Sequence, residues 1–341
     1  LSKSKGVTLM ARRQDRLTVE DVNGAWAIIP TPAIDTGDQW QTEDSVDYDE
    51  VAKAVEGLIT AGVDAIMCQG TFGEGATLTW EEKKKMMEVM VETANGRVPV
   101  FVGVTTMNTR ETIHQLKHAR DIGADGTMLG LPMWQQIDVA GAVRFYQDVA
   151  EAVPEMAICV YANPEAFKFD FPAPFWAQVA NIPQVITCKY INIGQLHLHT
   201  LVSRKQIRFL PLEFDHADAA KMDPEFHTAF WSPCACTGPE LTILWRDSVK
   251  ESVKTGDWSV PNGLYEKMIP VLANLFPPGG FAEFSRYNIQ LEKERINAGG
   301  WMKAGPCRPP YQSAPANYLE GAAKAGSGWA ELAKKVVDGT L

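Results

Sequence analysis

The segment TWEEKKKMMEVMVETANGRVPVFVGV, residues 79–104, contains the repeating unit that decides the fold. Thr79 and Glu82 have the spacing of a helix-capping box, so residues 80–93 are expected to form a helix. Gly96 stands where that helix should end, and the apolar run 99–104 that follows is expected to be a buried strand. The segment therefore predicts a helix that leads directly into a buried strand.

The same alternation of strands and helices extends over most of the chain. Helices are also expected over residues 48–61 and 109–122, which Gly62 and Gly123 should end. The expected strands span residues 25–30, 65–69, 99–104, 126–131, 157–161, 185–190, 207–212 and 228–231. Eight such units predict an α/β fold, a (β/α)8 TIM barrel. The alternative is a doubly wound sheet, but no Gly-x-Gly-x-x-Gly motif follows the first strand.

The chain continues well beyond the eighth strand, further than one closing helix requires. Helical patterns span residues 240–255, 265–276, 282–298 and 318–338, and a proline-rich stretch at 305–311 interrupts them. We expect a catalytic barrel over residues 17–256 and a C-terminal helical extension, residues 257–341, packed on it. We expect the polar residues 1–9 to be an added or a disordered segment, and residues 1–16 to form an N-terminal extension.

Charge and composition restrict the class of protein. The formal net charge is −10 and the chain has no block of Lys and Arg, which argues against nucleic acid and anionic membranes as partners. No run of 18 apolar residues is present, and the start lacks the apolar region of a signal peptide. The six cysteines are scattered, and three fall inside expected strands, as in a reducing compartment. We therefore expect a cytoplasmic protein.

Lys189 ends the apolar run 184–190, which has the pattern of a buried strand. A buried ammonium is costly unless it is paired or loses its proton. A lysine in that situation is a nucleophile that can form a Schiff base with a carbonyl substrate. The alternative is a lysine just past the strand end whose charged group reaches water.

The carboxyl ends of the strands are where the active site of such a barrel lies. The polar and aromatic side chains expected there are Thr71, Thr105, Thr106, Tyr161, Lys189 and Trp231. Tyr161 ends the fifth strand and Lys189 the sixth, so a phenol and an amine should lie side by side. In Schiff-base chemistry the amine attacks a carbonyl, and a nearby hydroxyl transfers the protons.

Three motifs suggest a family: Gly70-Thr71-Phe72-Gly73-Glu74, Tyr161-Ala162-Asn163-Pro164, and Lys189 on the sixth strand. In these the chain resembles the pyruvate-dependent class I aldolases, which include dihydrodipicolinate synthase and N-acetylneuraminate lyase. It is similar in particular to the hydratase-aldolases of bacterial aromatic catabolism, which act on ortho-substituted benzylidenepyruvates. That closer resemblance runs from about residue 17 to the C-terminus and includes residues 24–26, 76–80, 167–171, 229–231, 287–289 and 305–311.

The resemblance implies catalytic roles for three residues. Lys189 would form the Schiff base, and Tyr161 would be the general acid and base beside it. Thr71 would relay a proton or bind near the pyruvyl group. The backbone amides of Thr71 and Phe72 would hold the carboxylate of the substrate.

The resemblance also implies a substrate site. Trp231 and Asn288 match positions for the aromatic end and for water or the new hydroxyl, and Thr105 is a further candidate at the mouth. Phe72, Ala166 and Trp134 stand where the synthase has a threonine, an arginine and a tyrosine from a neighbouring subunit. These departures make the mouth more apolar, which suits an aromatic substrate. Glu74 is expected to order its loop by hydrogen bonds, a structural role.

The implied reaction is that of a lyase which hydrates an arylidenepyruvate and cleaves it to an aromatic aldehyde and pyruvate. It needs neither a metal ion nor an organic cofactor.

A homotetramer is expected, as is common in the superfamily, with the loop at 132–134 as a contact. Two alternatives are a lyase or dehydratase of an aliphatic 2-oxo acid and a non-catalytic sensor. The joint presence of Lys189, Tyr161 and Thr71 disfavours the sensor.

The ortho substituent of the substrate depends on the segment after the lysine. His197 and His199 are expected near the mouth, where they would favour a carboxylate and thus trans-2'-carboxybenzalpyruvate, an intermediate of phenanthrene breakdown. The alternative is that both are ordinary residues of a solvent-facing helix. In that case trans-o-hydroxybenzylidenepyruvate, from naphthalene breakdown, is the substrate.

The pairs His114 with His118 and Cys234 with Cys236 lack further ligands, so no metal site is predicted.

Overall fold

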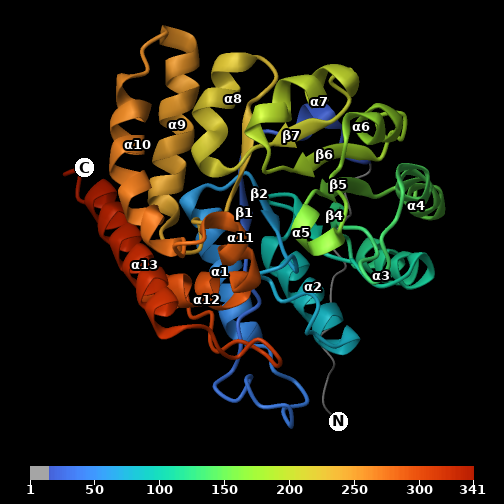
Figure 1. Ribbon diagram of the computed structural model, residues 1–341, viewed down its shortest axis with the longest axis horizontal. Helices are drawn as coiled ribbons and strands as arrows, with labels where there is room; N and C mark the ends of the chain where they lie inside the picture. Colours follow the sequence, from blue (N-terminus) through green and yellow to red (C-terminus); the bar gives the residue numbers. More distant parts are fainter. Residues whose placement is uncertain (1–14) are drawn as a thin grey trace.

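Eight parallel strands form a barrel at the centre of the molecule (Figure 1). The computed structural model describes residues 15–341, and its strands are β1 (Gly24–Ile28), β2 (Ala65–Met67), β3 (Val100–Val102), β4 (Gly126–Leu129), β5 (Ala157–Tyr161), β6 (Val185–Lys189), β7 (Arg208–Leu210) and β8 (Ala229–Ser232). Each strand pairs with the next along the chain as far as β7, and β1 pairs with β8. A parallel bridge between Leu212 and Trp231 closes the barrel. The predicted TIM barrel is confirmed, and the doubly wound alternative is wrong.

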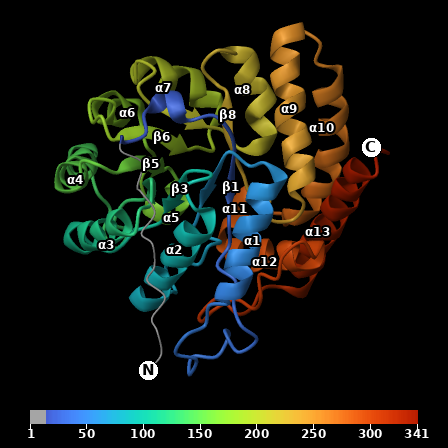
Figure 2. The same ribbon diagram turned by 180° about the vertical axis from the view of Figure 1, so that it is seen from behind.

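Helices connect successive strands and cover the outside of the barrel (Figure 2). They are α1 (Tyr48–Ala61), α2 (Trp80–Ala94), α3 (Thr109–Asp121), α4 (Val139–Ala152), α5 (Pro164–Phe167), α6 (Ala173–Val179), α7 (Leu196–Val202) and α8 (His216–Met222), with 3-10 turns η1 (Val19–Asp21), η2 (Ile193–Gln195) and η3 (Glu213–Asp215). Every residue of the eight strands is buried. This burial explains why the strands read as continuous apolar runs rather than as alternating patterns.

The ends of α1 and α2 follow from their sequences. Thr79 Oγ1 accepts a hydrogen bond from the backbone N–H of Glu82 at 3.2 Å, and Glu82 Oε2 accepts one from the backbone N–H of Thr79 at 2.8 Å. Asn95 ends α2 in the left-handed conformation, one residue before the predicted Gly96. Gly62 ends α1 with a φ of 97°, a conformation that glycine adopts without strain. Each helix therefore stops where the chain must turn into the next strand.

Five helices follow β8, and the last four of them lie in the C-terminal extension. They are α9 (Pro239–Thr255), α10 (Ser259–Leu272), α11 (Gly280–Arg286), α12 (Asn288–Gly299) and α13 (Ala316–Val337), with a 3-10 turn η4 (Ala273–Leu275) after α10. The helix expected over residues 282–298 is broken at Tyr287, whose ψ of 21° leaves the helical region. The helix expected from residue 265 begins earlier, at Ser259.

The extension contacts the barrel along several segments. Trp329 on α13 is buried and donates from Nε1 to the carbonyl of Gly238 at 3.2 Å. The backbone N–H of Ala33, after β1, donates to the carbonyl of Ala304 at 3.0 Å. The boundary placed after residue 256 falls in the turn between α9 and α10, and it stays a prediction.

The N-terminal extension predicted over residues 1–16 lies outside the described residues, except for its last two positions. Among the helices of residues 15–341, none combines the length and the apolar composition needed to cross a membrane.

Candidate active site

Lys189 is buried at the end of β6, at the mouth of the barrel. It is 6% exposed, so the alternative in which its ammonium reaches bulk water is wrong. Its Nζ lies 3.6 Å from the centre of the Trp231 ring and 4.6 Å from the centre of the Tyr161 ring. The faces of aromatic rings attract a cation and offset part of the cost of burying it. The two rings therefore fix the amine at one place in the mouth.

Tyr161 lies beside Lys189 because the two residues are register partners on β5 and β6. Its hydroxyl lies 2.7 Å from Thr71 Oγ1 and accepts a hydrogen bond from Asn163 Nδ2 at 3.2 Å. Burial alone would raise the pKa of Tyr161, but the charge of Lys189 and these hydrogen bonds outweigh burial, and the pKa lies below its ordinary value. A phenol with a lowered pKa beside an amine is suited to transfer protons.

Asn163 belongs to this hydrogen-bonded group, although its motif alone assigned it no role. Its Oδ1 accepts from the backbone N–H of Ala166 at 3.2 Å and so caps α5. Nδ2 then faces both Tyr161 and Thr71, at 3.4 Å from Thr71 Oγ1. The signal in the sequence was an asparagine directly before a proline, which marks the start of a helix and fixes the direction of the side chain.

The loop between β2 and α2 brings Thr71 to Tyr161. Its path is tight, because a Cβ on Gly75 would lie 2.3 Å from the carbonyl oxygen of Gln69. Only glycine permits so close an approach of two backbone segments. The backbone N–H of Thr71 faces the Tyr161 hydroxyl and helps to lower its pKa. In the described part of the chain, the backbone N–H of Phe72 donates to no backbone carbonyl, as one half of the predicted carboxylate cradle requires.

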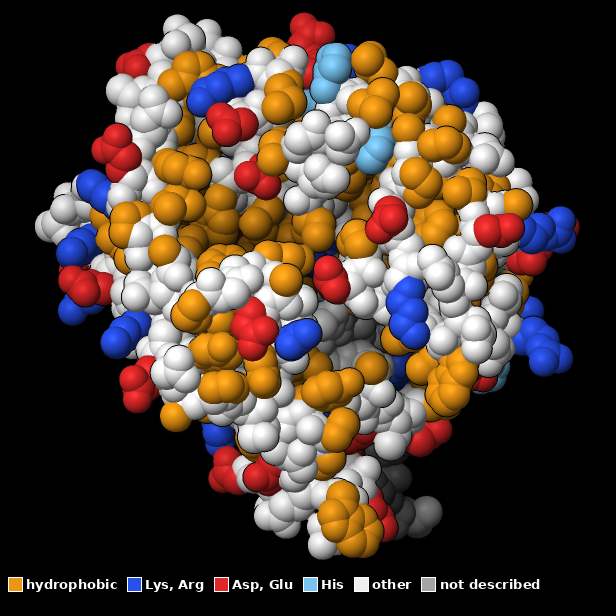
Figure 3. Space-filling model, viewed as in Figure 1, with side chains coloured by type: hydrophobic (Ala, Val, Ile, Leu, Met, Phe, Trp, Pro, Cys, Tyr) orange, Lys and Arg blue, Asp and Glu red, His pale blue; other side chains and the backbone are white. Residues whose placement is uncertain are grey.

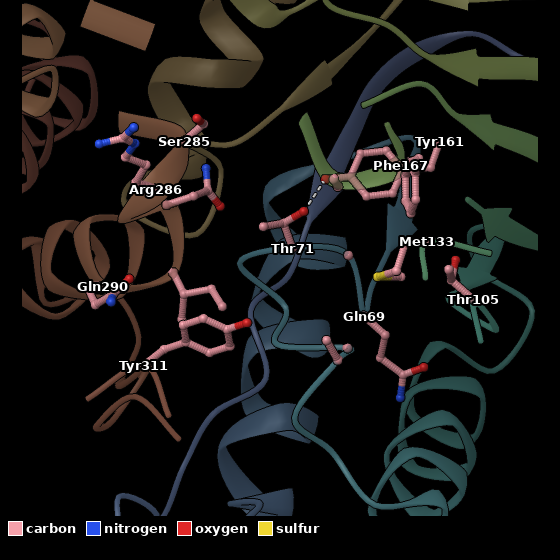
Figure 4. Close-up of a pocket in the computed structure, with 16 residues that line it drawn as sticks. Gln69, Thr71, Thr105, Met133, Tyr161, Phe167, Ser285, Arg286, Gln290 and Tyr311 are labelled. Atoms are coloured by element: carbon pink, nitrogen blue, oxygen red, sulfur yellow. Dashed lines mark hydrogen bonds between the residues drawn. The ribbon is translucent and has the colours of Figure 1, made fainter. Parts of the chain in front are cut away.

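A cavity of about 270 Å³ lies between the mouth of the barrel and the extension. Figure 3 shows a hollow in the face on which Figure 1 places α5 and α11. In Figure 4, Gln69, Thr105, Met133, Tyr161 and Phe167 lie on the barrel side, Ser285, Arg286, Gln290 and Tyr311 lie on the extension side, and Thr71 lies between them. Asn288 also lines the cavity, and its Oδ1 is buried with no hydrogen-bond partner among the described residues. A ligand or a water that donates to this oxygen would satisfy it.

Six of the eight predicted site residues gather at the mouth. They are Lys189, Tyr161, Thr71, Thr105, Trp231 and Asn288. Lys189 and Trp231 are not among the residues that line the cavity, but Lys189 Nζ lies 4.6 Å from the ring of Tyr161, which does line it, and 3.6 Å from the ring of Trp231. The structure does not bring Phe72 or Trp134 into the cavity. Phe72 packs in the hydrophobic core, and Trp134 is 74% exposed on the loop after β4, beside Met107 and Pro132.

The chain matches one known family over more than half of its length. Residues 36–211 match the dihydrodipicolinate synthetase family. The chain belongs to this family. Among curated members, the trans-O-hydroxybenzylidenepyruvate hydratase-aldolase of Pseudomonas putida is 55% identical over 320 residues, which cover 94% of this chain and 96% of that protein. The trans-2'-carboxybenzalpyruvate hydratase-aldolase of Nocardioides sp. (strain KP7) is 34% identical over 325 residues, 94% of this chain and 97% of that protein.

A solved structure is also similar to this chain over nearly the whole length of both. PhdJ bound to a substrate intermediate has a TM-score of 0.91 and is 41% identical, over 94% of this chain and 99% of that one. Because these relatives are hydratase-aldolases and are similar over nearly the whole chain, the protein is a hydratase-aldolase of arylidenepyruvates, and therefore a lyase. The prediction of an enzyme is confirmed and the sensor alternative is wrong. The identities favour the hydroxy alternative over the carboxy substrate that the sequence led us to prefer.

In this protein, the two histidines after Lys189 do not supply positive charge to the cavity. His199 is on the buried side of α7, where its Nδ1 lies 2.7 Å from the hydroxyl of Tyr190 and burial lowers its pKa. His197 is exposed, because residues two apart on a helix point in different directions. The reasoning that favoured a carboxylated substrate was therefore wrong.

The remaining histidine and cysteine pairs have packing contacts. The rings of His114 and His118 pack edge-on against Trp80. Cys234 and Cys236 are both buried. Within residues 15–341, no three side chains of His, Cys, Asp or Glu gather as a metal ion would require.

Proposed function

We propose that Lys189 forms a Schiff base with the 2-oxo group of an arylidenepyruvate, and that this intermediate serves both hydration and cleavage. The observation that carries the proposal is the buried Nζ of Lys189 beside Tyr161, whose hydroxyl is hydrogen-bonded to Thr71. Attack of the amine gives a carbinolamine, which must gain a proton before it loses water. Tyr161 supplies that proton to the leaving hydroxyl and is reprotonated through Thr71 Oγ1. The carboxylate of the substrate binds the backbone amides of Thr71 and Phe72.

Hydration follows because the iminium withdraws electrons through the conjugated double bond. Water adds to the benzylic carbon and loses a proton, which leaves an enamine between C2 and C3. Protonation of C3 restores the iminium and completes the addition of water. The unpaired Oδ1 of Asn288 supports a role in holding this water from the extension side of the cavity.

Cleavage reverses an aldol addition. Tyr161, or a water held by Asn288, removes the proton of the new hydroxyl, and the C3–C4 bond breaks with its electron pair passing to the iminium nitrogen. The aromatic aldehyde leaves. The remaining enamine is protonated at C3, and hydrolysis releases pyruvate and the free amine of Lys189.

The substrate that we infer is trans-o-hydroxybenzylidenepyruvate. The curated enzyme named for it is 55% identical to this chain, against 34% for the carboxy enzyme. The chemistry of the cavity agrees, because Arg286 is the one cation among its described lining residues. The Arg286 side chain is 75% exposed, and its Nη1 lies 3.6 Å from Glu283. A second carboxylate would thus be desolvated without a buried cation, whereas a phenol needs only a hydrogen bond.

The test is the ratio of kcat/KM for the hydroxy and the carboxy substrate. We expect a preference for the hydroxy compound of at least about tenfold, which one unpaired charge is sufficient to produce. Arg286→Ala should leave this ratio nearly unchanged. A preference for the carboxy compound would reverse the assignment. Pyruvate release from aliphatic 4-hydroxy-2-oxo acids, but not from either aryl compound, would instead favour the aliphatic lyase.

We further propose that the enzyme is a cytoplasmic homotetramer that uses no metal ion or organic cofactor. Trp134 and Met107 are exposed on neighbouring loops, and large exposed apolar side chains are typical of subunit contacts. Light scattering should give the mass of four chains for the wild type and a smaller mass for Trp134→Glu. Turnover should be unchanged after treatment with a metal chelator.

A further inference from the structure

A buried cluster of three charged side chains joins the extension to the loop that carries Thr71. It consists of Glu74 in that loop, Lys293 on α12, and Arg308 between α12 and α13, each at most 2% exposed. Glu74 Oε2 accepts from Lys293 Nζ at 2.7 Å and from Arg308 Nη1. Glu74 Oε1 accepts from the backbone N–H of Arg308 at 2.7 Å. Both carboxylate oxygens are therefore bound by the extension.

The backbone of Glu74 connects this cluster to Thr71. The N–H of Glu74 donates to the carbonyl of Thr71 at 2.9 Å. Glu74 has a φ of 54°, a left-handed conformation that residues other than glycine adopt only when their surroundings hold them in it. Because the extension holds the side chain of Glu74 and its N–H holds Thr71, a displacement of Glu74 displaces Thr71 as well.

Lys293, the second cation of the cluster, is not needed to balance the charge of Glu74. Arg308 alone would balance it, and Arg308 also donates to Ser45 Oγ at 2.6 Å and to the carbonyl of Pro32 at 3.0 Å. Burial lowers the pKa of Lys293, against the opposing effect of the Glu74 charge. Burying a further ion is generally neutral or unfavourable for stability compared with apolar packing. A geometric role accounts for Lys293 better than a contribution to stability does.

We propose that Lys293 and Arg308 are positioning residues that keep Thr71 Oγ1 within hydrogen-bonding distance of the Tyr161 hydroxyl. This inference rests on the proposed function, in which Tyr161 and Thr71 transfer the protons. The extension then contributes to the proton relay as well as to the cavity wall. Loss of Lys293 slows proton transfer without disturbing Lys189, which is held by other residues.

Lys293→Met is the variant that tests this role. It removes the ammonium but keeps a long apolar side chain, and it leaves Glu74 paired with Arg308, so no charge in the cluster is unbalanced. The matched control is Arg208→Met at the start of β7. Arg208 is also a buried cation, but it donates to Val22 and Asn23, at the end of the barrel opposite the mouth.

Two measurements are made on each variant. The first is kcat and KM for pyruvate release. The second is an ultraviolet titration of the Tyr161 phenol, obtained by subtracting the titration of Tyr161→Phe. A loss of stability alone would not move the second measurement.

For Lys293→Met we expect kcat to fall on the order of 100-fold, as a misplacement of about 1 Å can cause. KM should change little, and Tyr161 should ionise at higher pH than in the wild type. Arg208→Met should lower the melting temperature but leave the Tyr161 titration unchanged. In a Thr71→Val background, Lys293→Met should cause no further loss of kcat, because the contact that it disturbs is already absent. If Lys293→Met does not fold, Lys293→Gln should give a smaller shift in the same direction.

An unchanged Tyr161 titration in the folded Lys293 variant would overturn the positioning role. So would an equal loss of kcat from Lys293→Met in the wild-type and Thr71→Val backgrounds. If the wild type releases no pyruvate from arylidenepyruvates, the proposed function fails instead. The Tyr161 titration still tests the positioning role in that case, since it requires no turnover.

Discussion

Replacing Thr71 with valine removes the hydroxyl that contacts Tyr161 and keeps the shape of the side chain. The contact measures 2.7 Å, shorter than the 3.2 Å hydrogen bond from Asn163, so it is the stronger of the two. A hydrogen bond to a charged group contributes about 1.5–3 kcal/mol. Since about 1.4 kcal/mol corresponds to a factor of ten in rate, kcat should fall roughly 10- to 150-fold if the Tyr161 phenolate forms during turnover. Asn163 remains, so the loss should be smaller than for Tyr161→Phe.

The assay is pyruvate release measured across pH for the wild type, Thr71→Val and Thr71→Ser. The hydrogen bond from Thr71 lowers the pKa of Tyr161. Because Tyr161 acts as the acid on the carbinolamine, the falling limb of kcat/KM, which reports the free enzyme, should therefore move to higher pH in Thr71→Val. Thr71→Ser restores the hydroxyl and should restore most of the rate. A Thr71→Val enzyme within about threefold of the wild type, or a serine variant as slow as the valine one, would refute the relay.

Two further predictions concern stability and the active-site loop. Burial, opposed by hydrogen bonds from two hydroxyls, raises the pKa of Glu213 from 4.5 to about 7. Wild-type stability should therefore fall as pH rises from 4.5 to 7, and Glu213→Gln should remove this loss, worth up to about 3 kcal/mol above pH 7 in denaturant unfolding. A constant difference between the two proteins across this range would contradict the assignment. Gly75→Ala should lower kcat by at least about tenfold, because its Cβ would force the loop away from Gln69. Gly263→Ala, whose Cβ meets nothing within 4 Å, is the control and should keep the wild-type kcat.

The barrel and the core of the site could be predicted because their signals are local. The capping box of Thr79 and Glu82 lies within four residues, and each strand is a short and largely apolar run. Once the strand order is known, Tyr161 and Lys189 must be neighbours, because successive strands of the barrel pair in register. Their contact follows from topology alone.

The parts that the sequence could not predict depend on contacts between distant segments. Glu74 is 219 residues from Lys293 and 234 from Arg308, and no periodic pattern reports a pairing over such a separation. Trp134 lies on a loop whose path no repeating pattern determines, so its exposure could not be read from its position after β4. The direction of His199 depends on where the short helix α7 begins, and a shift of one residue would turn it elsewhere.

The central claim is that Lys189 forms a Schiff base, and borohydride reduction in the presence of pyruvate tests it most directly. Reduction converts the imine to a stable secondary amine, which peptide mass analysis then locates. The account predicts a pyruvate-derived adduct on Lys189 in the wild type, and neither adduct nor pyruvate release in Lys189→Ala. An unmodified Lys189 after reduction, or full pyruvate release by Lys189→Ala, would contradict it.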